Sequence, residues 1–154
     1  MNEFQLIDRF FRHPTSSDGV KVGVGDDGAV LATHGDRDLV VATDTLVERI
    51  HFSRDSEPAD LGHKILAVNL SDLAAMGAEP DWVTLNLVLP TANSKWLEEF
   101  SQGFFSLANR CHVTLVGGDT SRGPLCLTAT AGGWVPRGQA LCRAGAQSGD
   151  LIYV

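Results

Sequence analysis

The sequence of 154 residues has little positive charge, few cysteines and no long apolar run. Its 12 Lys and Arg residues are outnumbered by 19 Asp and Glu residues, a balance that disfavours the basic surface of nucleic-acid-binding proteins. The three cysteines form no C-x-x-C pair, which indicates a reducing compartment rather than a disulfide framework. The chain shows no apolar run near the roughly 20 residues of a membrane span, and no signal-peptide pattern. We therefore expect a cytoplasmic protein that binds neither nucleic acid nor a membrane.

Two common nucleotide-binding motifs are also missing. Gly23-x-Gly25-x-x-Gly28 has the spacing of the dinucleotide fingerprint, but that motif needs a strand before it and a helix after it. Here a hairpin pattern follows, and Asp26 and Asp27 would face the pyrophosphate. The sequence G-x-x-x-x-G-K-[ST] does not occur, which excludes a P-loop. An acidic chain of this kind would need divalent cations between itself and an anionic substrate.

The spacing of apolar residues predicts one α+β domain over residues 1–154. Helices are expected at 2–11, 61–80 and 94–109, and strands at 29–32, 39–43, 82–89, 113–116 and 125–135, with another beginning at 151. His34-Gly35-Asp36 is the expected turn between the first two strands, and Ser94 the expected N-cap of the last helix. The order predicts a mixed, mostly antiparallel sheet with the two long helices on one face.

The predicted helix 61–80 carries one unusual residue, Asp72. Asn69 and Asp72 lie three positions apart and share a face with apolar side chains such as Val68 and Met76. A carboxylate on a face that must pack is costly unless it is paired or bound to a metal. Asp72 is therefore expected to have a cationic partner.

Four aspartates are candidates for one metal site: Asp27, Asp44, Asp72 and Asp119. Asp44 and Asp119 each follow a predicted strand, and Asp27 lies in a Gly-rich loop before one. Oxygen ligands without Cys or His spacing select Mg²⁺ or Mn²⁺ rather than Zn²⁺. The alternative is that each aspartate is an ordinary turn or cap residue, which explains Asp72 least well.

Three further features are candidates for binding a phosphorylated substrate. The segment 117–124 places backbone N–H groups and a guanidinium beside Asp119, as phosphate and metal sites require, although its glycines also fit a simple turn. Arg143 is a second phosphate candidate, and otherwise a surface arginine. His51 is a candidate substrate contact, its alternative being a packed side chain beside Phe52.

Five segments together resemble one known family. They are NEFQLIDRF, GVGDDGAVL, ATDTLVERIHF, LGHKILAVNLSDLAAMGAEP and LVGGDTSRGPL. Along nearly the whole chain these resemble the N-terminal half of the thiamine-monophosphate kinases, which belong to the superfamily named after aminoimidazole ribonucleotide synthetase. The NLSDLAAMGA helix is shared across that superfamily, whereas the TDTLV…HF and GGDTSRGP segments are typical of the thiamine-phosphate branch.

The resemblance implies direct transfer of the γ-phosphoryl group of ATP to thiamine monophosphate, assisted by several Mg²⁺ ions. By matched position, it implies metal ligands at Asp27, Thr43, Asp44, Asp72 and Asp119, nucleotide contacts at Gly118, Asp119 and Arg143, and a thiamine monophosphate contact at His51. Ala42 departs from the family, which often has Ser before the Thr-Asp pair. The resemblance also implies a homodimer formed through the sheet.

The family pattern further implies that this chain is incomplete as an enzyme. Residues 1–20 would be the N-terminal helix and loop, 21–149 the core, and 150–154 the start of a strand leading to a C-terminal domain beyond this sequence. We expect the chain alone to be inactive. The alternatives are another ATP-dependent enzyme of the same superfamily, or a non-catalytic module for nucleotide binding or dimerisation.

Overall fold

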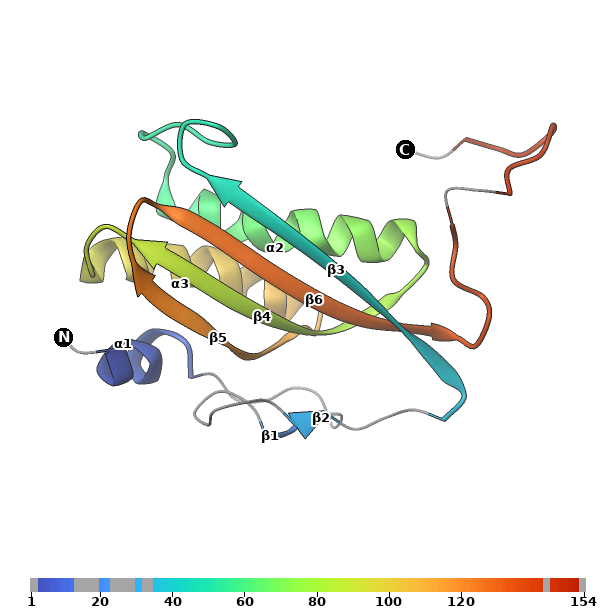
Figure 1. The fold of residues 1–154 in the computed structure, drawn as a ribbon, viewed down its shortest axis with the longest axis horizontal. Helices are drawn as coiled ribbons and strands as arrows, with labels where there is room; N and C mark the ends of the chain where they lie inside the picture. Colours follow the sequence, from blue (N-terminus) through green and yellow to red (C-terminus); the bar gives the residue numbers. More distant parts are fainter. Residues whose placement is uncertain (1–2, 13–19, 23–29, 32–34, 143–144, 153–154) are drawn as a thin grey trace.

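A four-stranded sheet with two long helices on one face forms the main body of the chain (Figure 1). The computed structural model describes residues 3–12, 20–22, 30–31, 35–142 and 145–152. The sheet has the order β3 (Arg37–Val47), β6 (Cys126–Pro136), β4 (Glu79–Leu89) and β5 (Thr114–Arg122). The long helices are α2 (Pro58–Ala75) and α3 (Ser94–Arg110), and the smaller elements are α1 (Glu3–Phe10), β1 (Val20–Val22) and β2 (Val30–Leu31).

The strand directions confirm the predicted fold class. Strands β3 and β4 both run antiparallel to β6, whereas β4 and β5 are parallel and are connected through α3. In β4 the side chains of Val83, Leu85 and Leu87 are buried, while Thr84 and Asn86 between them are more exposed. This period of two places one face of the sheet against the helices.

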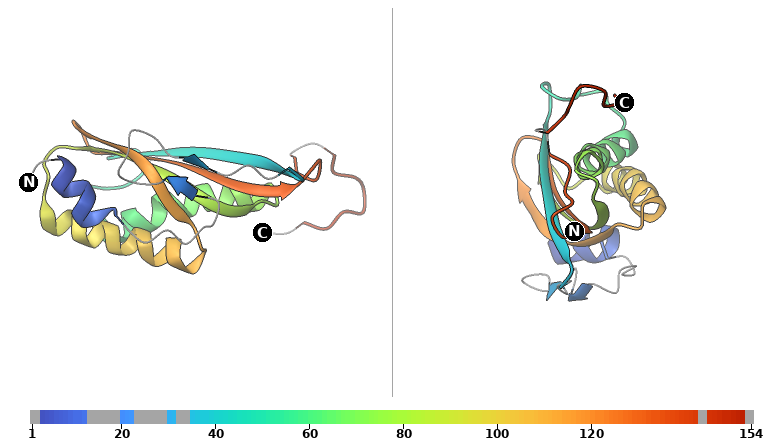
Figure 2. Two further views of the ribbon diagram at one scale, coloured as in Figure 1. Left: turned by 90° about the horizontal axis from the view of Figure 1, so that it is seen from below. Right: turned by 90° about the vertical axis from the view of Figure 1, so that its right-hand side faces the viewer.

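Both long helices lie on the same side of the sheet (Figure 2). α2 contacts β3, β4 and β6, α3 contacts β5, and the two helices contact each other extensively. On the opposite face, Leu39 and Val41 of β3 are 46% and 53% exposed. No described helix is long and apolar enough to cross a membrane.

Two glycines allow α2 and α3 to approach closely. A Cβ atom on Gly62 of α2 would overlap the carbonyl oxygen of Phe100, and one on Gly103 of α3 would overlap the carbonyl oxygen of Ala59. Because glycine has no side chain, the backbones of α2 and α3 can approach each other closely at these two positions. Around this contact lie fully buried side chains of both helices, including Ile65 and Phe104.

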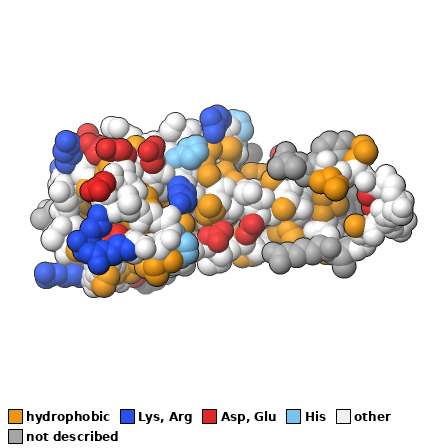
Figure 3. All heavy atoms as spheres, turned by 90° about the horizontal axis from the view of Figure 1, so that it is seen from above, with side chains coloured by type: hydrophobic (Ala, Val, Ile, Leu, Met, Phe, Trp, Pro, Cys, Tyr) orange, Lys and Arg blue, Asp and Glu red, His pale blue; other side chains and the backbone are white. Residues whose placement is uncertain are grey.

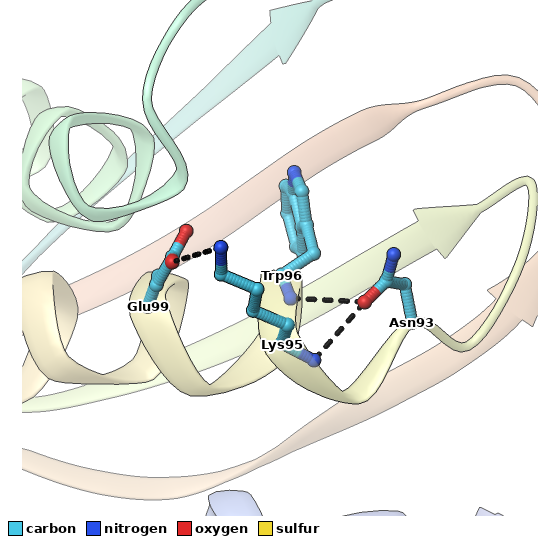
Figure 4. A network of polar contacts seen from close by, with 4 residues as sticks. All are labelled: Asn93, Lys95, Trp96 and Glu99. Atoms are coloured by element: carbon cyan, nitrogen blue, oxygen red, sulfur yellow. Dashed lines mark hydrogen bonds and ion pairs between the residues drawn. The ribbon is translucent and has the colours of Figure 1, made fainter.

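The N-terminus of α3 is capped by Asn93 and not by Ser94, so the predicted cap is wrong by one residue. The Asn93 side-chain oxygen accepts hydrogen bonds from the backbone N–H groups of Lys95 at 3.0 Å and Trp96 at 3.2 Å (Figure 4). Lys95 also pairs with Glu99 one turn later, at 3.7 Å. Asn and Ser are comparable caps, so the sequence NS leaves the choice to the backbone. The apolar stripe of this helix is buried, and it includes Leu97, Phe100 and Phe104.

The boundaries of α2 and β4 also differ from the prediction. α2 begins at Pro58, a residue suited to the first helical turn, and ends at Ala75 rather than at Pro80. Gly77 follows with φ of +71°, the left-handed conformation that commonly ends helices. Pro80 belongs to β4, where the pairing with β6 shifts register between Pro80 and Trp82. A proline is tolerated there because the ladder is already irregular.

The predicted hairpin of strands 29–32 and 39–43 is wrong. β2 pairs with β1 in a separate two-stranded sheet, and β3 pairs with β6 along all eleven of its residues. Both β3 and β5 extend further than expected, to Val47 and Arg122. Residues 151–152 form no strand, contrary to the expected start of one.

The contact between α2 and α3 yields a stability prediction. Gly62→Ala and Gly103→Ala each force the two helix backbones apart, and we expect each to lower the free energy of unfolding by about 1–3 kcal/mol. Gly35→Ala is the control, because a Cβ there meets nothing within 4 Å. Urea unfolding monitored by circular dichroism measures all three. Equal stabilities of the three variants would contradict the packing described.

The cap of α3 yields a second prediction. Asn93→Ala removes the acceptor for two backbone N–H groups, so we expect a loss of about 1 kcal/mol. Ser94→Ala should change the free energy of unfolding by less than about 0.5 kcal/mol. The same urea titration decides between the two residues, and a larger loss for Ser94→Ala would make Ser94 the cap.

Candidate functional site

Side chains along β3 point alternately to the two faces of the sheet, so Thr43 and Asp44 lie on different faces. Thr43 and Thr45 are exposed on the face away from the helices, and their hydroxyls meet those of Thr130 and Thr128 on β6 at 3.0 and 2.9 Å. Asp44 is half-buried on the other face, the side of Leu46, against which α2 packs. The two adjacent candidate ligands therefore point to opposite sides of the sheet.

Gly118 and Asp119 lie within β5, at the edge of the sheet. Gly118 has φ of +153°, and a Cβ there would overlap the carbonyl oxygen of Leu85, so glycine is required beside β4. Asp119 is exposed and lies opposite Asn86, on the face away from the helices. Ser121 donates its hydroxyl hydrogen bond to Asp119 Oδ2 at 2.7 Å.

The prediction that Asp44 and Asp119 follow strand ends is therefore wrong, because both lie inside longer strands. They occupy the two outer strands of the sheet, three strand spacings or roughly 14 Å apart, and they face opposite sides. Among the residues that the structure describes, no three His, Cys, Asp or Glu side chains lie close enough to hold an ion together. The described part of one chain does not assemble the predicted cluster.

On α2 the structure reverses the expected roles of Asn69 and Asp72. Asn69 is completely buried, while Asp72 is exposed. The Asn69 amide donates to the carbonyl of Ile65 at 2.9 Å, and its Oδ1 atom has no partner among the described residues. The predicted packing of Asp72 is wrong, because the rotation of α2 turns the Asn69 amide inward and the Asp72 carboxylate outward.

The three candidate aspartates that the structure describes nevertheless suit a hard divalent cation. Asp44, Asp72 and Asp119 take part in none of the ion pairs found in the described residues. In the part of the chain that the structure describes, no cationic side chain pairs with any of these carboxylates, and the whole chain has a net charge of -7. Mg²⁺ is usually bound through one or two carboxylates together with substrate phosphates and water. Separated aspartates are compatible with such ions when the phosphates complete each coordination sphere.

His51 lies in a tight turn after β3. Its Nδ1 atom accepts a hydrogen bond from the backbone N–H of Val47 at 3.0 Å, and its carbonyl accepts one from Lys64 Nζ at 2.7 Å. Residues 49–54 line an open depression on the surface. His51 is exposed rather than packed in the core, contrary to the alternative considered for it.

Asp27 and Arg143, the other predicted site residues, lie outside the described residues. Two further residues, Ser121 and Lys64, contact Asp119 and His51 and were not predicted as site residues from the sequence. Ser121 lies two positions after Asp119, a spacing that gives a common face only in a strand. Because this segment was expected to be a loop, the spacing did not predict the contact between Ser121 and Asp119. Nothing in the sequence indicates the contact of Lys64 with a carbonyl thirteen residues earlier.

Comparison with known proteins places the chain in a class. Residues 25–135 match the family described as AIR synthase related protein, N-terminal domain. The chain belongs to this family. Within it, the thiamine-monophosphate kinase of Escherichia coli (strain K12) is similar along the whole sequence, with 53% identity over 153 residues that make up 99% of this chain and 47% of that protein.

Solved structures give the same result. The crystal structure of thiamine-monophosphate kinase from Stenotrophomonas maltophilia K279a has 51% identity and a TM-score of 0.85, covering 96% of this chain and 46% of that one. AaThiL complexed with AMPPCP and TMP has 30% identity and a TM-score of 0.70, covering 94% and 45%. The chain thus spans about half the length of the relatives that it matches.

The positions of Asn69 and Asp72 yield a third prediction. Asn69→Asp places an unpaired carboxylate in the core, and we expect a loss of about 3 kcal/mol or more at pH 7. Asp72→Asn, the matched exchange three residues later, should change stability by less than about 0.5 kcal/mol. Thermal and urea unfolding of both variants are the measurements. A large loss for Asp72→Asn would show that its carboxylate supports the fold.

Proposed function

We propose that this chain is the N-terminal half of a cytoplasmic thiamine-monophosphate kinase. The reaction transfers the γ-phosphoryl group of ATP to thiamine monophosphate, giving ADP and thiamine diphosphate. The observation that carries the proposal is the 53% identity to the Escherichia coli enzyme over 99% of the chain. The structure of AaThiL with AMPPCP and TMP, 30% identical, supports the two substrates.

In the proposed site, Asp27, Thr43, Asp44, Asp72 and Asp119 hold Mg²⁺ ions. Bound Mg²⁺ would neutralise phosphate charge and hold the two substrates in register. The unpaired carboxylates of Asp44, Asp72 and Asp119 support this role, since nothing else in the described chain neutralises them.

Gly118, Asp119 and Arg143 are proposed to contact the nucleotide, and His51 thiamine monophosphate. The close approach of β5 to β4 explains why residue 118 is glycine, and its nucleotide contact is proposed from its matched position in the family. No general base is assigned. The attacking group is a phosphate monoester oxygen that is already ionised near neutral pH, so the protein's task is positioning.

A homodimer formed through the uncovered sheet face is part of the proposal. Leu39 and Val41 are about half exposed on that face, and the described helices α2 and α3 both cover the other one (Figure 2). An apolar sheet surface of this kind is stabilised when a second copy removes it from water. The hydroxyl ladder of Thr43 and Thr45 with β6 continues the same face with groups that can pair across an interface.

A coupled ADP-release assay tests the proposed activity. We expect the complete protein that contains this chain to consume ATP with thiamine monophosphate, and to stop when Mg²⁺ is removed by chelation. Thiamine without its phosphate is the control acceptor. The chain of 154 residues alone should show little or no turnover, because its relatives are about twice as long.

Two outcomes would contradict this proposal. Turnover with a different phosphate acceptor, but none with thiamine monophosphate, would make the protein another member of the superfamily. A reading frame that ends at Val154, together with nucleotide binding but no turnover, would favour the non-catalytic module. Calorimetric titration of Mg²⁺ and an ATP analogue into the chain distinguishes binding from catalysis.

A further inference from the structure

The turn that follows β3 fixes the orientation of His51. The carbonyl of Val47 accepts hydrogen bonds from the N–H groups of Ile50 at 3.1 Å and His51 at 2.9 Å, and the N–H of Arg49 donates to the carbonyl of Phe52 at 2.7 Å. Arg49 has φ of +67°, an uncommon conformation for a residue with a side chain. The segment is thus closed by its own backbone hydrogen bonds and not an open loop.

The imidazole ring of His51 takes part in this turn through one nitrogen. Nδ1 lies 3.0 Å from the backbone nitrogen of Val47, which carries a hydrogen and can only donate. Nδ1 must therefore accept, so the neutral ring carries its proton on Nε2. This assignment follows from the chemistry of the partner and not from an inferred hydrogen position. The neutral side chain presents an N–H donor at its free end.

Lys64 connects the turn to α2. Its Nζ atom donates to the carbonyl oxygen of His51 at 2.7 Å. The next residues along the helix, Ile65 and Leu66, are fully buried, so the backbone that carries Lys64 is fixed by the core. Lys64 thereby holds the His51 backbone relative to the same helix that carries Asp72.

An excess of positive charge does not account for anion binding at the surface around His51. Basic and acidic side chains both gather at the end of the molecule where β3 leads into α2 (Figure 3). Arg54, for example, is paired with Glu48 at 3.4 Å. A general attraction for anions is therefore weak here, and the specific hydrogen-bond geometry of His51 is the more selective feature.

We propose that His51 recognises the substrate as a hydrogen-bond donor through Nε2–H, and that Lys64 is the positioning residue that holds it there. This inference rests on the proposed function, in which His51 contacts thiamine monophosphate. The group recognised must be an acceptor, either a phosphate oxygen or a ring nitrogen. A neutral His51 cannot serve as a base in this arrangement, because Nδ1 is occupied and Nε2 is protonated.

The tautomer and the anchor are tested on this chain without substrate. Long-range ¹H–¹⁵N spectra of the histidine-labelled protein report which ring nitrogen is protonated, and the signal lost in His51→Gln identifies His51. We expect Nε2–H alone, and a shifted Val47 amide and averaged ring signals in Lys64→Met. Lys95→Met, which alters a lysine on α3, is the control. A protonated Nδ1, or a Lys64→Met spectrum identical to that of Lys95→Met, overturns the proposal.

Steady-state kinetics of the complete protein test recognition. His51→Asn keeps an acceptor near the Val47 N–H but removes the distal donor, so KM for thiamine monophosphate should rise about tenfold, the effect of one hydrogen bond. Lys64→Met should raise the same KM several-fold with kcat and the KM for ATP unchanged, and Lys64→Arg should restore most of the loss. An unchanged KM in Lys64→Met overturns the positioning role, whether or not His51 binds substrate.

Titration with different ligands distinguishes a phosphate oxygen from a ring nitrogen as the acceptor. A shift of the His51 Nε2–H signal of the complete protein with thiamine monophosphate and inorganic phosphate, but not with thiamine, identifies a phosphate oxygen. A shift with thiamine identifies a ring nitrogen. No shift with any of the three overturns the donor role. If the complete protein does not phosphorylate thiamine monophosphate, both the proposed function and the substrate role of His51 are wrong. The spectra of Lys64→Met still test whether Lys64 positions His51.

Discussion

The close approach of α2 and α3 is the contact on which the rest of this fold depends. Gly62 and Gly103 have no side chain at the points where the backbone of the other helix passes. The two helices therefore fit side by side over one face of a four-stranded sheet. With both helices on that face, the other face carries threonine side chains and the half-exposed side chains of Leu39 and Val41. The same contact fixes the rotation of α2, which buries Asn69 and leaves Asp72 and Lys64 facing solvent.

In the proposed metal site, the separation of the aspartates has a physical advantage, because the cations would bind together with the substrates. Carboxylates gathered at one point repel each other when no ion is present, and that repulsion would be a permanent cost to folding. Here Asp44 and Asp119 lie on opposite edges and opposite faces of the sheet, with Asp72 on a helix. In the proposed reaction, the phosphates of the substrates provide the remaining ligands and neutralise the ions that these residues attract.

Several features of this arrangement followed from the sequence, and others did not, for identifiable reasons. The buried stripe of α3 and the alternating face of β4 were predictable. Large apolar residues recur with the helical period in α3 and at every second residue in β4. The strand through Gly117 to Arg122 was not, because Gly117, Gly118 and Asp119 have low strand propensity and the pairing partner β4 is distant in the sequence. The pairing of β3 with β6 joins residues as far apart in the sequence as Arg37 and Pro136, which no local pattern encodes.

The sequence by itself determined the fold class, the family and the identity of the candidate ligands, since these depend on residue type and local periodicity. Tertiary structure decided which of those ligands share a face, which carboxylate is exposed, and that His51 is held by Val47 and Lys64. The reason is that a side chain's direction depends on the rotation of its helix and the register of its strand. Both are set by packing against elements distant in the sequence, as the glycines between α2 and α3 show.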